Sequence, residues 1–347
     1  MLGATRQQTS IASNAIVNAR TQTMEAIVLT EYGSPDVLRF EEVERPTITG
    51  DDVLVRVHAA AICKGDVHLL TGKPYLIRLA GFGLLRPKHR IPGQNVAGRV
   101  EAVGRNVTAL RPGDDVYGEV PSGAFAEYVS APAKAFAPKP SNLTFQQAAA
   151  VPASGMTALQ GLRDVGNLQP GQSVLINGAS GGVGTFAVQI AKALGAEVTA
   201  VCSTRHVDLM RSIGADHVID YTKEDFALSG VRHDVMLDLV GNRSLSNCKR
   251  VLKPMGVFVS SAGSPGGNWI GPLVWMLKVM VTGAFASQKM TPFMMTPRRD
   301  DLMVLKQLIE DGKVTPVIER RYARSEVASA LRHVAAGHAQ GTTVISE

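Results

Sequence analysis

The stretch that decides the fold runs from residue 173 to residue 184 and reads Ser-Val-Leu-Ile-Asn-Gly-Ala-Ser-Gly-Gly-Val-Gly. An apolar run ends in a glycine-rich turn, and an amphipathic segment, residues 185–194, follows at once. This order predicts a strand, a tight turn and a helix. Ala179, Gly181 and Gly184 have the spacing of the dinucleotide-binding fingerprint, with alanine at its first glycine position. We therefore expect a dinucleotide pyrophosphate to bind at this turn.

Each small residue of the fingerprint has a physical reason. Ala179 permits the turn, Gly181 lets the backbone approach the pyrophosphate, and Gly184 lets the helix pack on the strand. The unpaired N–H groups and the dipole at the helix N-terminus favour the anion. The alternative is a glycine-rich loop without a ligand, which the flanking strand and helix disfavour.

The next apolar run indicates which dinucleotide binds. Residues 197–202 end at Ser203, Thr204 and Arg205, about 20 residues after the last glycine, where an NAD site usually has an acidic side chain. Two hydroxyls and a guanidinium stand there instead, and the planar guanidinium suits a 2′-phosphate. This favours NADPH over NADH. The alternative is that Arg205 is a solvated charge at the start of a helix.

Composition restricts the class of protein. The chain has 347 residues, 45% hydrophobic and 19% charged, which predicts a soluble globular protein of two domains. Cys63, Cys202 and Cys248 are odd in number and far apart, so we expect no disulfide framework, no structural zinc cluster and a reducing compartment. The net charge is +6, but the basic residues are spread along the chain. We interpret the basic residues of 73–90 as a solvated loop or an anion-attracting rim, not as a nucleic-acid surface.

Two segments are relevant to where the protein resides in the cell and to whether it spans a membrane. Residues 1–23 contain two arginines and no acid, and we expect a flexible extension before Met24 and a cytoplasmic protein. The same composition is typical of an organellar transit peptide, which is the alternative. The most apolar stretch, residues 270–286, is shorter than the roughly 20 residues that a membrane-spanning helix needs. We expect it to form a buried helix, a dimer face or a wall of the substrate pocket.

The organisation of the chain predicts an α/β protein. Residues 24–150 contain short strand-like runs broken by Gly, Pro and Asp, which is typical of a β-rich domain. In residues 151–287, strands alternate with helices, as in a doubly wound parallel sheet. The expected strands there are 198–202, 217–219, 235–239 and 257–260. Residues 288–347 end in an apolar run and are expected to return to the first domain.

Several motifs together carry a resemblance. They lie at residues 91–100, 103–107, 112–116, 150–158, 178–184 and 214–221. The chain resembles the medium-chain dehydrogenase/reductase superfamily in its zinc-independent quinone oxidoreductase-like branch. Residues 337–341 resemble the closing turn of the subgroup that includes the reticulon-4-interacting mitochondrial oxidoreductases. The resemblance implies a GroES-like catalytic domain, a Rossmann NADP-binding domain and a homodimer through the edge of the Rossmann sheet.

The ligands of a catalytic zinc are not expected here. Zinc-dependent members have a Cys, a Gly-His-Glu and then a Cys or Asp, which leave an open coordination position. Cys63 stands where the first ligand would be, but Gln94 and Asn95 replace the His and Glu. No Cys, His or Asp lies between residues 149 and 158. One thiolate cannot hold a catalytic zinc, so we expect no metal.

The expected chemistry follows from the missing metal. Alcohol oxidation without a Lewis acid needs another strong proton acceptor, whereas hydride addition to a polarised double bond does not. That reaction needs orientation, a dry pocket and a donor for the oxyanion. We therefore expect NADPH-dependent reduction of a quinone or an α,β-unsaturated carbonyl. The alternatives are a dinucleotide-binding regulatory or RNA-binding protein with little turnover, and a zinc-dependent alcohol dehydrogenase.

The catalytic candidates lie in residues 62–75. Lys64, His68 and Tyr75 are possible proton carriers, and the phenol of Tyr75 can also stack on a flat substrate. Each has a structural alternative, namely a surface charge, a helix residue and a packing residue. Cys63 stands where many zinc-free relatives have an Asn that helps to hold the nicotinamide ribose.

The resemblance also implies cofactor contacts. The pyrophosphate would lie at Ala179, Ser180, Gly181, Gly182, Val183 and Gly184, the 2′-phosphate at Ser203, Thr204 and Arg205, and the adenosine phosphate beside Tyr221. Thr157, Gly241 and Ala262 would lie near the nicotinamide, and His338 and Gln340 would close over the cofactor. Asp238 is expected to support a strand end and not to catalyse.

Overall fold

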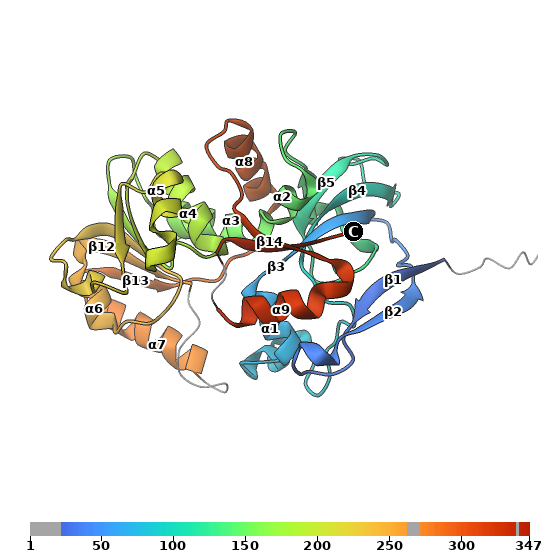
Figure 1. Cartoon of the computed structure of the whole chain (residues 1–347), viewed down its shortest axis with the longest axis horizontal. Helices are drawn as coiled ribbons and strands as arrows, with labels where there is room; N and C mark the ends of the chain where they lie inside the picture. Colours follow the sequence, from blue (N-terminus) through green and yellow to red (C-terminus); the bar gives the residue numbers. More distant parts are fainter. Residues whose placement is uncertain (1–21, 262–270, 338–339) are drawn as a thin grey trace, which may run out of the picture.

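The computed structural model describes residues 22–261, 271–337 and 340–347. Of the expected N-terminal extension, residues 1–21 therefore lie outside the described residues. The chain forms two large β-sheets that lie side by side, with helices between and around them (Figure 1). A separate antiparallel pair, β1 (Thr23–Val28) and β2 (Arg39–Glu44), lies beside the first sheet.

The first sheet has seven strands. Its order is β14-β15-β3-β4-β5-β7, and β6 pairs with β3. The bounds are β3 Asp52–Ile62, β4 Asn95–Val103, β5 Asp115–Glu119, β6 Tyr128–Pro132, β7 Phe136–Pro138, β14 Ile318–Ala323 and β15 Thr342–Ser346. Because β15 pairs antiparallel with β3, the end of the chain lies in the sheet formed by its first third.

The second sheet has six parallel strands in the order β10-β9-β8-β11-β12-β13. The bounds are β8 Ser173–Asn177, β9 Glu197–Cys202, β10 His217–Asp220, β11 His233–Asp238, β12 Leu252–Ser260 and β13 Lys289–Pro292. β13 follows the expected domain boundary at residue 287 and still joins this sheet. The strand order reverses at β8, which creates a switch point between β8 and β11, where ligands of such sheets bind at the carboxyl ends.

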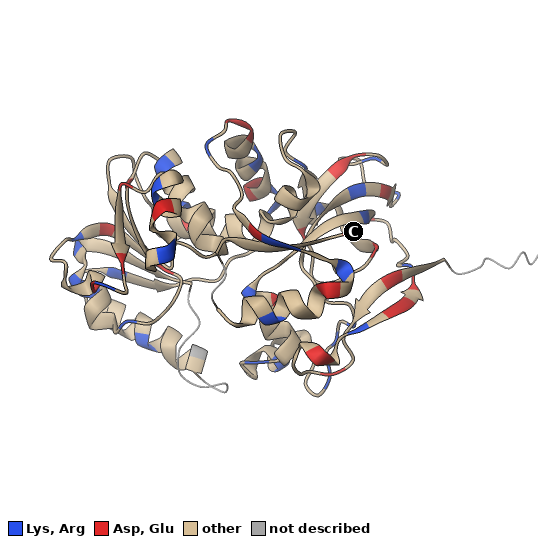
Figure 2. Ribbon diagram, in the orientation of Figure 1, with Lys and Arg blue, Asp and Glu red and all other residues tan. Residues whose placement is uncertain are grey.

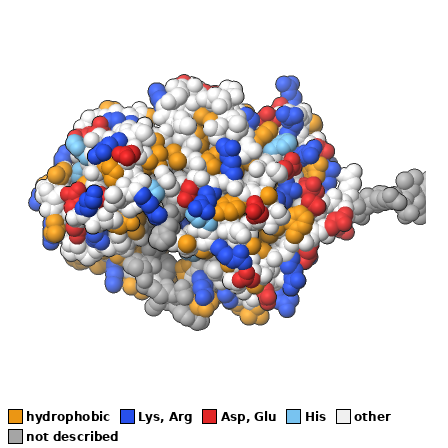
Figure 3. All heavy atoms as spheres, viewed as in Figure 1, with side chains coloured by type: hydrophobic (Ala, Val, Ile, Leu, Met, Phe, Trp, Pro, Cys, Tyr) orange, Lys and Arg blue, Asp and Glu red, His pale blue; other side chains and the backbone are white. Residues whose placement is uncertain are grey.

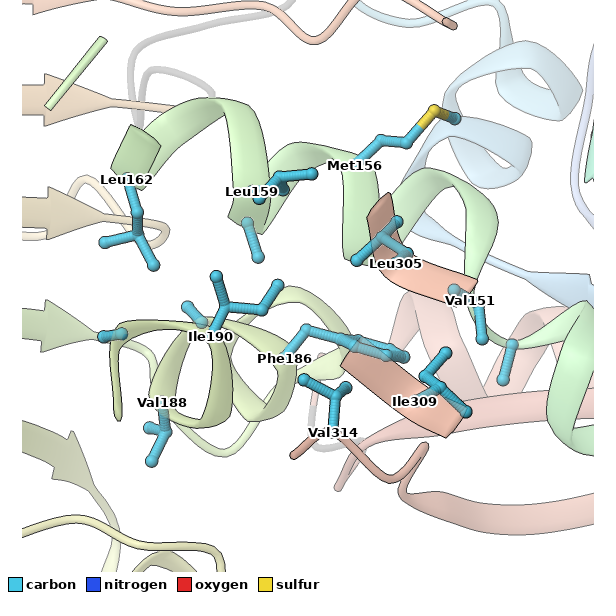
Figure 4. Close-up of a cluster of buried hydrophobic side chains, with 14 of the residues drawn as sticks. Val151, Met156, Leu159, Leu162, Phe186, Val188, Ile190, Leu305, Ile309 and Val314 are labelled. Atoms are coloured by element: carbon cyan, nitrogen blue, oxygen red, sulfur yellow. The ribbon is translucent and has the colours of Figure 1, made fainter. Parts of the chain in front are cut away.

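The helices connect the sheets and cover them. Their bounds are α1 Lys64–Thr71, α2 Phe145–Ala149, α3 Pro152–Leu159, α4 Gly182–Ala193, α5 Val207–Ser212, α6 Leu245–Arg250, α7 Gly271–Ala284, α8 Arg299–Glu310 and α9 Val327–Ala335. Side chains of α3, α4 and α8 interdigitate in one buried cluster (Figure 4). Ala59, Ala97 and Tyr117 of the first sheet belong to the same cluster. The two sheets therefore share a core, which fixes the position of one sheet relative to the other.

Helix α7 corresponds to the apolar stretch predicted at residues 270–286. Most of its apolar side chains are exposed, and only Val279 is completely buried among those that the structure describes. The alternative of a buried helix is therefore wrong. Within the described residues, no helix is long and apolar enough to cross a membrane.

Charged residues are distributed over the surface. On the face drawn in Figure 3, basic and acidic side chains are interspersed. The ribbon in Figure 2 carries both signs on both sheets. This distribution agrees with the spread of Lys and Arg along the sequence.

Candidate cofactor and substrate site

The glycine-rich turn joins β8 to α4 at the switch point of the second sheet. Gly178 has a φ of +88°, a left-handed conformation that favours glycine, and the Ala179 N–H donates to the Val201 carbonyl at 3.0 Å. Gly181 is the N-cap of α4 and offers no side chain to the first turn of the helix. The first N–H groups of α4 have no intrahelical acceptor. They are therefore available to an anion.

The two later glycines of the turn have different surroundings. A Cβ at Gly184 would lie 2.3 Å from the Gly178 carbonyl oxygen and 2.5 Å from that of Ala179. The helix is thus packed directly on the turn. A Cβ at Gly181 would meet only the Gly178 oxygen, at 3.6 Å. The space beside Gly181 is open, as close approach of a pyrophosphate to the backbone requires, so these residues fit a dinucleotide.

The C-terminal segment contacts this turn. The Gly341 N–H donates to the Ser180 carbonyl at 2.9 Å, and Gly341 forms a parallel bridge with Gly181. Gln340 is half-buried immediately before this contact. His338, the other residue expected to close over the cofactor, lies outside the described residues.

The residues expected at the 2′-phosphate follow the end of β9. Ser203 is half-buried, and Thr204 and Arg205 are exposed. Among the described residues, Arg205 has no hydrogen-bond or ion-pair partner, so its exposed guanidinium is free to bind an anion. Tyr221 follows β10 and is also exposed, and its N–H donates to the Cys202 carbonyl at 3.0 Å.

An acid that the sequence analysis missed lies beside Thr204. The Thr204 hydroxyl donates to Asp220 Oδ2 at 2.6 Å, so its one proton is already used. Asp220 ends the neighbouring strand β10, and hydrogen bonds from Thr204 and Thr222 hold its pKa at about 2. Lys223 Nζ lies 3.5 Å from the same carboxylate. The region therefore contains one ionised acid and two cations.

Asp238 organises the switch point. Its Oδ1 accepts from Asn177 Nδ2 at 2.9 Å, from the Val240 N–H at 3.1 Å and from the Gly241 N–H at 3.0 Å. These bonds tie the ends of β8 and β11 together and hold Gly241 at a φ of +72°. The expectation that Asp238 supports a strand end is confirmed.

Two further residues were expected near the nicotinamide. The Thr157 hydroxyl donates to the Ala153 carbonyl at 2.6 Å within α3 and is half-buried. Ala262 lies outside the described residues.

Cys63 lies at the N-cap of α1, beside the buried acid Asp66 and the half-buried acid Glu119. Its N–H donates to Asp66 Oδ2 at 2.8 Å. Glu119 lies near Asp66, at the end of β5 and opposite Asn95 of β4. Among the described residues, Asp66 Oδ1 and Glu119 Oε2 have no hydrogen-bond partner. Sequence reasoning missed both acids.

The low polarity around this pair favours the protonated forms. Burial raises the pKa of Asp66 to about 6, although hydrogen bonds oppose the shift. Burial and the charge of Asp66 raise the pKa of Glu119 to about 7. Burial, followed by the same charge, also raises the pKa of the Cys63 thiol well above its usual range. At neutral pH the thiol therefore keeps its proton.

The parent protein is expected to lose stability between pH 5 and pH 8, and Glu119→Gln is expected to remove this loss. In the unfolded chain the Glu119 carboxyl loses its proton at about pH 4.3, whereas in the folded chain it keeps the proton until about pH 7. Between these values the folded state binds more protons, so stability falls as the pH rises. The amide removes this loss, which amounts to about 1–3 kcal/mol. Urea unfolding at both pH values measures it, and an equal pH dependence in Glu119→Gln and the parent protein would contradict the assigned shift.

The other catalytic candidates lie on or after α1. Lys64 is exposed. His68 is also exposed, and its Nδ1 lies 2.8 Å from the Lys73 carbonyl oxygen, where it binds the loop after the helix. The guanidinium of Arg78 lies 4.8 Å from the centre of the half-buried Tyr75 ring. The structure thus brings Cys63 together with Asp66.

The residues at the zinc-ligand positions have other contacts. Asn95 Oδ1 accepts from the Ala153 N–H at 2.8 Å, which ties β4 to α3. Gln94 presents an amide, which is not a usual ligand of zinc. In residues 22–261, 271–337 and 340–347, no three His, Cys, Asp or Glu side chains are grouped so that they could hold a metal ion.

Fold and site together define a two-domain dinucleotide-binding protein. A family model described as an alcohol dehydrogenase GroES-like domain matches residues 49–141, and one described as a zinc-binding dehydrogenase matches residues 213–345. The mitochondrial NAD(P)H oxidoreductase RTN4IP1 of Bos taurus is 34% identical, over 98% of this chain and 93% of that protein. The chloroplastic NADPH-dependent alkenal/one oxidoreductase of Arabidopsis thaliana is 33% identical, over 99% of this chain and 85% of that protein.

A solved structure extends the similarity to the whole fold. The quinone oxidoreductase of Coxiella burnetii superimposes with a TM-score of 0.82 at 28% identity, over 94% of this chain and 100% of that one. The chain belongs to the medium-chain dehydrogenase/reductase superfamily, in its quinone oxidoreductase-like branch.

Proposed function

We propose that the protein transfers a hydride from NADPH to a quinone or an α,β-unsaturated carbonyl, without a metal ion. The observation that carries the proposal is the turn at Gly181, where open space meets the N-terminus of α4 at the switch point of the sheet. The names of the relatives support it, because they are an NAD(P)H oxidoreductase, an alkenal/one oxidoreductase and a quinone oxidoreductase.

Residues of the second sheet would hold the cofactor. The backbone from Ser180 to Gly184 would bind the pyrophosphate, and Gly341 would hold the turn in place through Ser180. The unpaired guanidinium of Arg205 supports a 2′-phosphate, whereas Lys223 is already paired with Asp220. Arg205 therefore favours NADPH over NADH.

The chain's own groups would provide the donor to the substrate oxygen. When bound, NADPH supplies the hydride, and negative charge develops on that oxygen. Cys63 keeps its proton at neutral pH, and its thiol would turn from its hydrogen bond with Asp66 to donate to that charge. Asp66, which is bonded to the Cys63 backbone, holds a second proton nearby below about pH 6. Tyr75, His68 and Lys64 remain candidates for the same role.

The donor set supports a reaction without zinc. Cys63 would be the single thiolate ligand, because the amides of Gln94 and Asn95 stand at the next two ligand positions. Asn95 already uses its oxygen to accept from Ala153. We therefore expect chelation to leave the activity unchanged.

A panel of electron acceptors tests the function. NADPH oxidation is followed with 9,10-phenanthrenequinone, an alkenal and an alkenone, and NADH is run in parallel. We expect steady turnover that favours NADPH and is insensitive to a chelator. Cofactor binding without turnover, together with salt-dependent RNA affinity, would support a regulatory or RNA-binding protein instead. Stoichiometric zinc and loss of activity on chelation would support an alcohol dehydrogenase.

Two further proposals concern assembly and location. The edge strand β13 has backbone N–H and C=O groups without a neighbouring strand on one side, and a homodimer through β13 would pair them. A cytoplasmic location agrees with three free cysteines, whereas the words mitochondrial and chloroplastic in the relatives' names leave organelles as the alternative. Light scattering and cell fractionation test these two proposals.

A further inference from the structure

The outward face of α7 is an unusual surface. It consists of exposed apolar side chains, and Phe285, which follows the helix, extends it. The exposed fractions are 61% for Leu277, 58% for Met280 and 88% for Phe285. The members of this face are Leu273, Val274, Met276, Leu277, Met280, Val281, Ala284 and Phe285. An exposed apolar surface of this kind marks a site of contact with a partner or a membrane.

The other side of α7 is fixed to the protein. Val279 is buried in the core under the second sheet, and Trp275 Nε1 donates to Ser260 Oγ at 3.1 Å. These contacts hold the helix so that its apolar face points away from the body. Figure 2 shows one blue stretch and no red on α7, because Lys278 is its one charged residue.

A cationic hollow adjoins this face. It lies between α6 and α7, has a volume of about 540 Å³ and is open to solvent. Its lining residues are Leu245, Ser246, Lys249, Arg250, Thr282 and Gln288. Among the described residues, neither Lys249 nor Arg250 has an ion-pair partner. Asp225, whose pKa is lowered in part by the charge of Arg250, is directly paired with Arg243 at 3.2 Å. The hollow therefore offers an anion two cations that make no direct ion pair among the described residues, together with hydroxyl groups.

Residues 79–88, which lie in the part of the molecule that contains the first sheet, also expose apolar and basic side chains. Leu79, Leu84 and Leu85 are exposed, and Leu85 has an exposed fraction of 85%. Arg86 and Lys88 are exposed beside them. This element contains the short helix η2 (Arg78–Phe82). It and α7 both lie along the lower edge of the molecule in Figure 1, one on each side of the junction between the two sheets.

We propose that the outward face of α7, the hollow at Lys249 and Arg250, and residues 79–88 form one surface that docks on a membrane containing anionic phospholipids. The apolar side chains would enter the boundary between headgroups and acyl chains, and the hollow would take a lipid phosphate. A helix of 14 residues is too short to span a bilayer, but it can lie in the interface. The proposal rests on the proposed function in one respect, since quinones with long apolar tails reside in membranes.

The positive charge of the proposed surface favours an anionic lipid membrane over a second copy of the chain as its partner. A two-fold contact places the same patch on both sides of the interface, so it would bring two copies of Lys249, Arg250 and Lys278 into one interface and concentrate positive charge there. An anionic lipid surface attracts each of these charges instead.

Vesicle flotation with the full chain tests the proposal. We expect binding to vesicles that contain phosphatidylglycerol to be at least about tenfold tighter than to phosphatidylcholine vesicles, since each cation near an anionic surface contributes about fivefold. Leu277→Glu and the double variant Lys249→Glu/Arg250→Glu should each weaken binding by about tenfold or more. Met255→Glu and Arg105→Glu/Arg111→Glu are the matched controls, because they change exposed residues elsewhere. The controls should bind as the parent protein does.

The outcomes separate the alternatives. Equal binding of variants and controls, or no binding by the parent protein, overturns the proposal. If Leu277→Glu converts a dimer to a monomer and leaves vesicle binding unchanged, the face seats a second copy, which also overturns it. Activity with 9,10-phenanthrenequinone in solution is a separate readout and should be unchanged in every variant. If the parent protein binds vesicles but reduces no acceptor, the proposed function fails and the docking surface stands.

Discussion

Gly184→Ala is expected to lower the free energy of unfolding of the cofactor-free protein by at least about 2 kcal/mol. The new Cβ would lie 2.3 Å from the Gly178 carbonyl oxygen and 2.5 Å from that of Ala179. Both are backbone atoms, so the strain cannot be relieved by rotating a side chain. The helix must move away from the turn. Urea unfolding monitored by circular dichroism measures the loss.

Gly181→Ala is the matched control for this variant. Its Cβ would meet only one atom, at 3.6 Å, so the cofactor-free protein should unfold like the parent protein. The methyl group would instead occupy space that the pyrophosphate needs, and NADPH binding should weaken. Equal stability of Gly184→Ala and Gly181→Ala would show that the close packing of α4 on the turn is wrongly assigned.

Arg205→Ala is expected to lower kcat/KM for NADPH by about 10-fold to 100-fold and to change the value for NADH by less than about twofold. A charged hydrogen bond between a guanidinium and a phosphate contributes about 1.5–3 kcal/mol, which corresponds to this range. NADH has no 2′-phosphate and should not respond. Steady-state kinetics with both cofactors and one quinone measures the ratio.

Arg211→Ala provides the matched control for the loss of a positive charge. Arg211 lies in α5, is exposed and is 3.5 Å from Asp208. It should leave both kinetic values unchanged. If Arg205→Ala retains the full preference for NADPH, Arg205 is a solvated charge at the start of a helix. Lys223 would then be the next residue to replace.

Much of the second sheet could be predicted from the sequence, because apolar runs alternate there with amphipathic segments. The strand predicted at residues 198–202 is β9 with one residue added. The strand predicted at 257–260 begins earlier, at Leu252, because an irregular register with β11 lets it continue past Pro254 and Gly256. Local patterns could not show that continuation, because it depends on pairing.

Helix α7 shows a second limit of the sequence. Its high apolar content predicts burial, and the structure buries one side of the helix only. Hydrophobicity alone does not say which surface covers a side chain. The contacts of Trp275 and Val279 decide which side faces the sheet.

The cofactor turn could be read from the sequence because its residues are contiguous. The roles of Asp66, Glu119 and Asp220 could not be read from the sequence. Each acid either contacts a residue of another segment or has a pKa that depends on its burial. Asp220 reaches Thr204 from the neighbouring strand, and burial and the charge of Asp66 in α1 raise the pKa of Glu119 at the end of β5. One signal was present, because Asp66 lies three residues after Cys63, at the capping-box position of α1.

Isotope transfer in the presence of a chelator tests the proposed reaction. The protein is incubated with an alkenone and NADPH that carries deuterium at both C4 positions of the nicotinamide. We expect the saturated ketone to gain one deuterium, at the β-carbon, at a rate that the chelator does not change. A product without deuterium, or turnover that the chelator abolishes and zinc restores, would contradict metal-free hydride transfer to carbon.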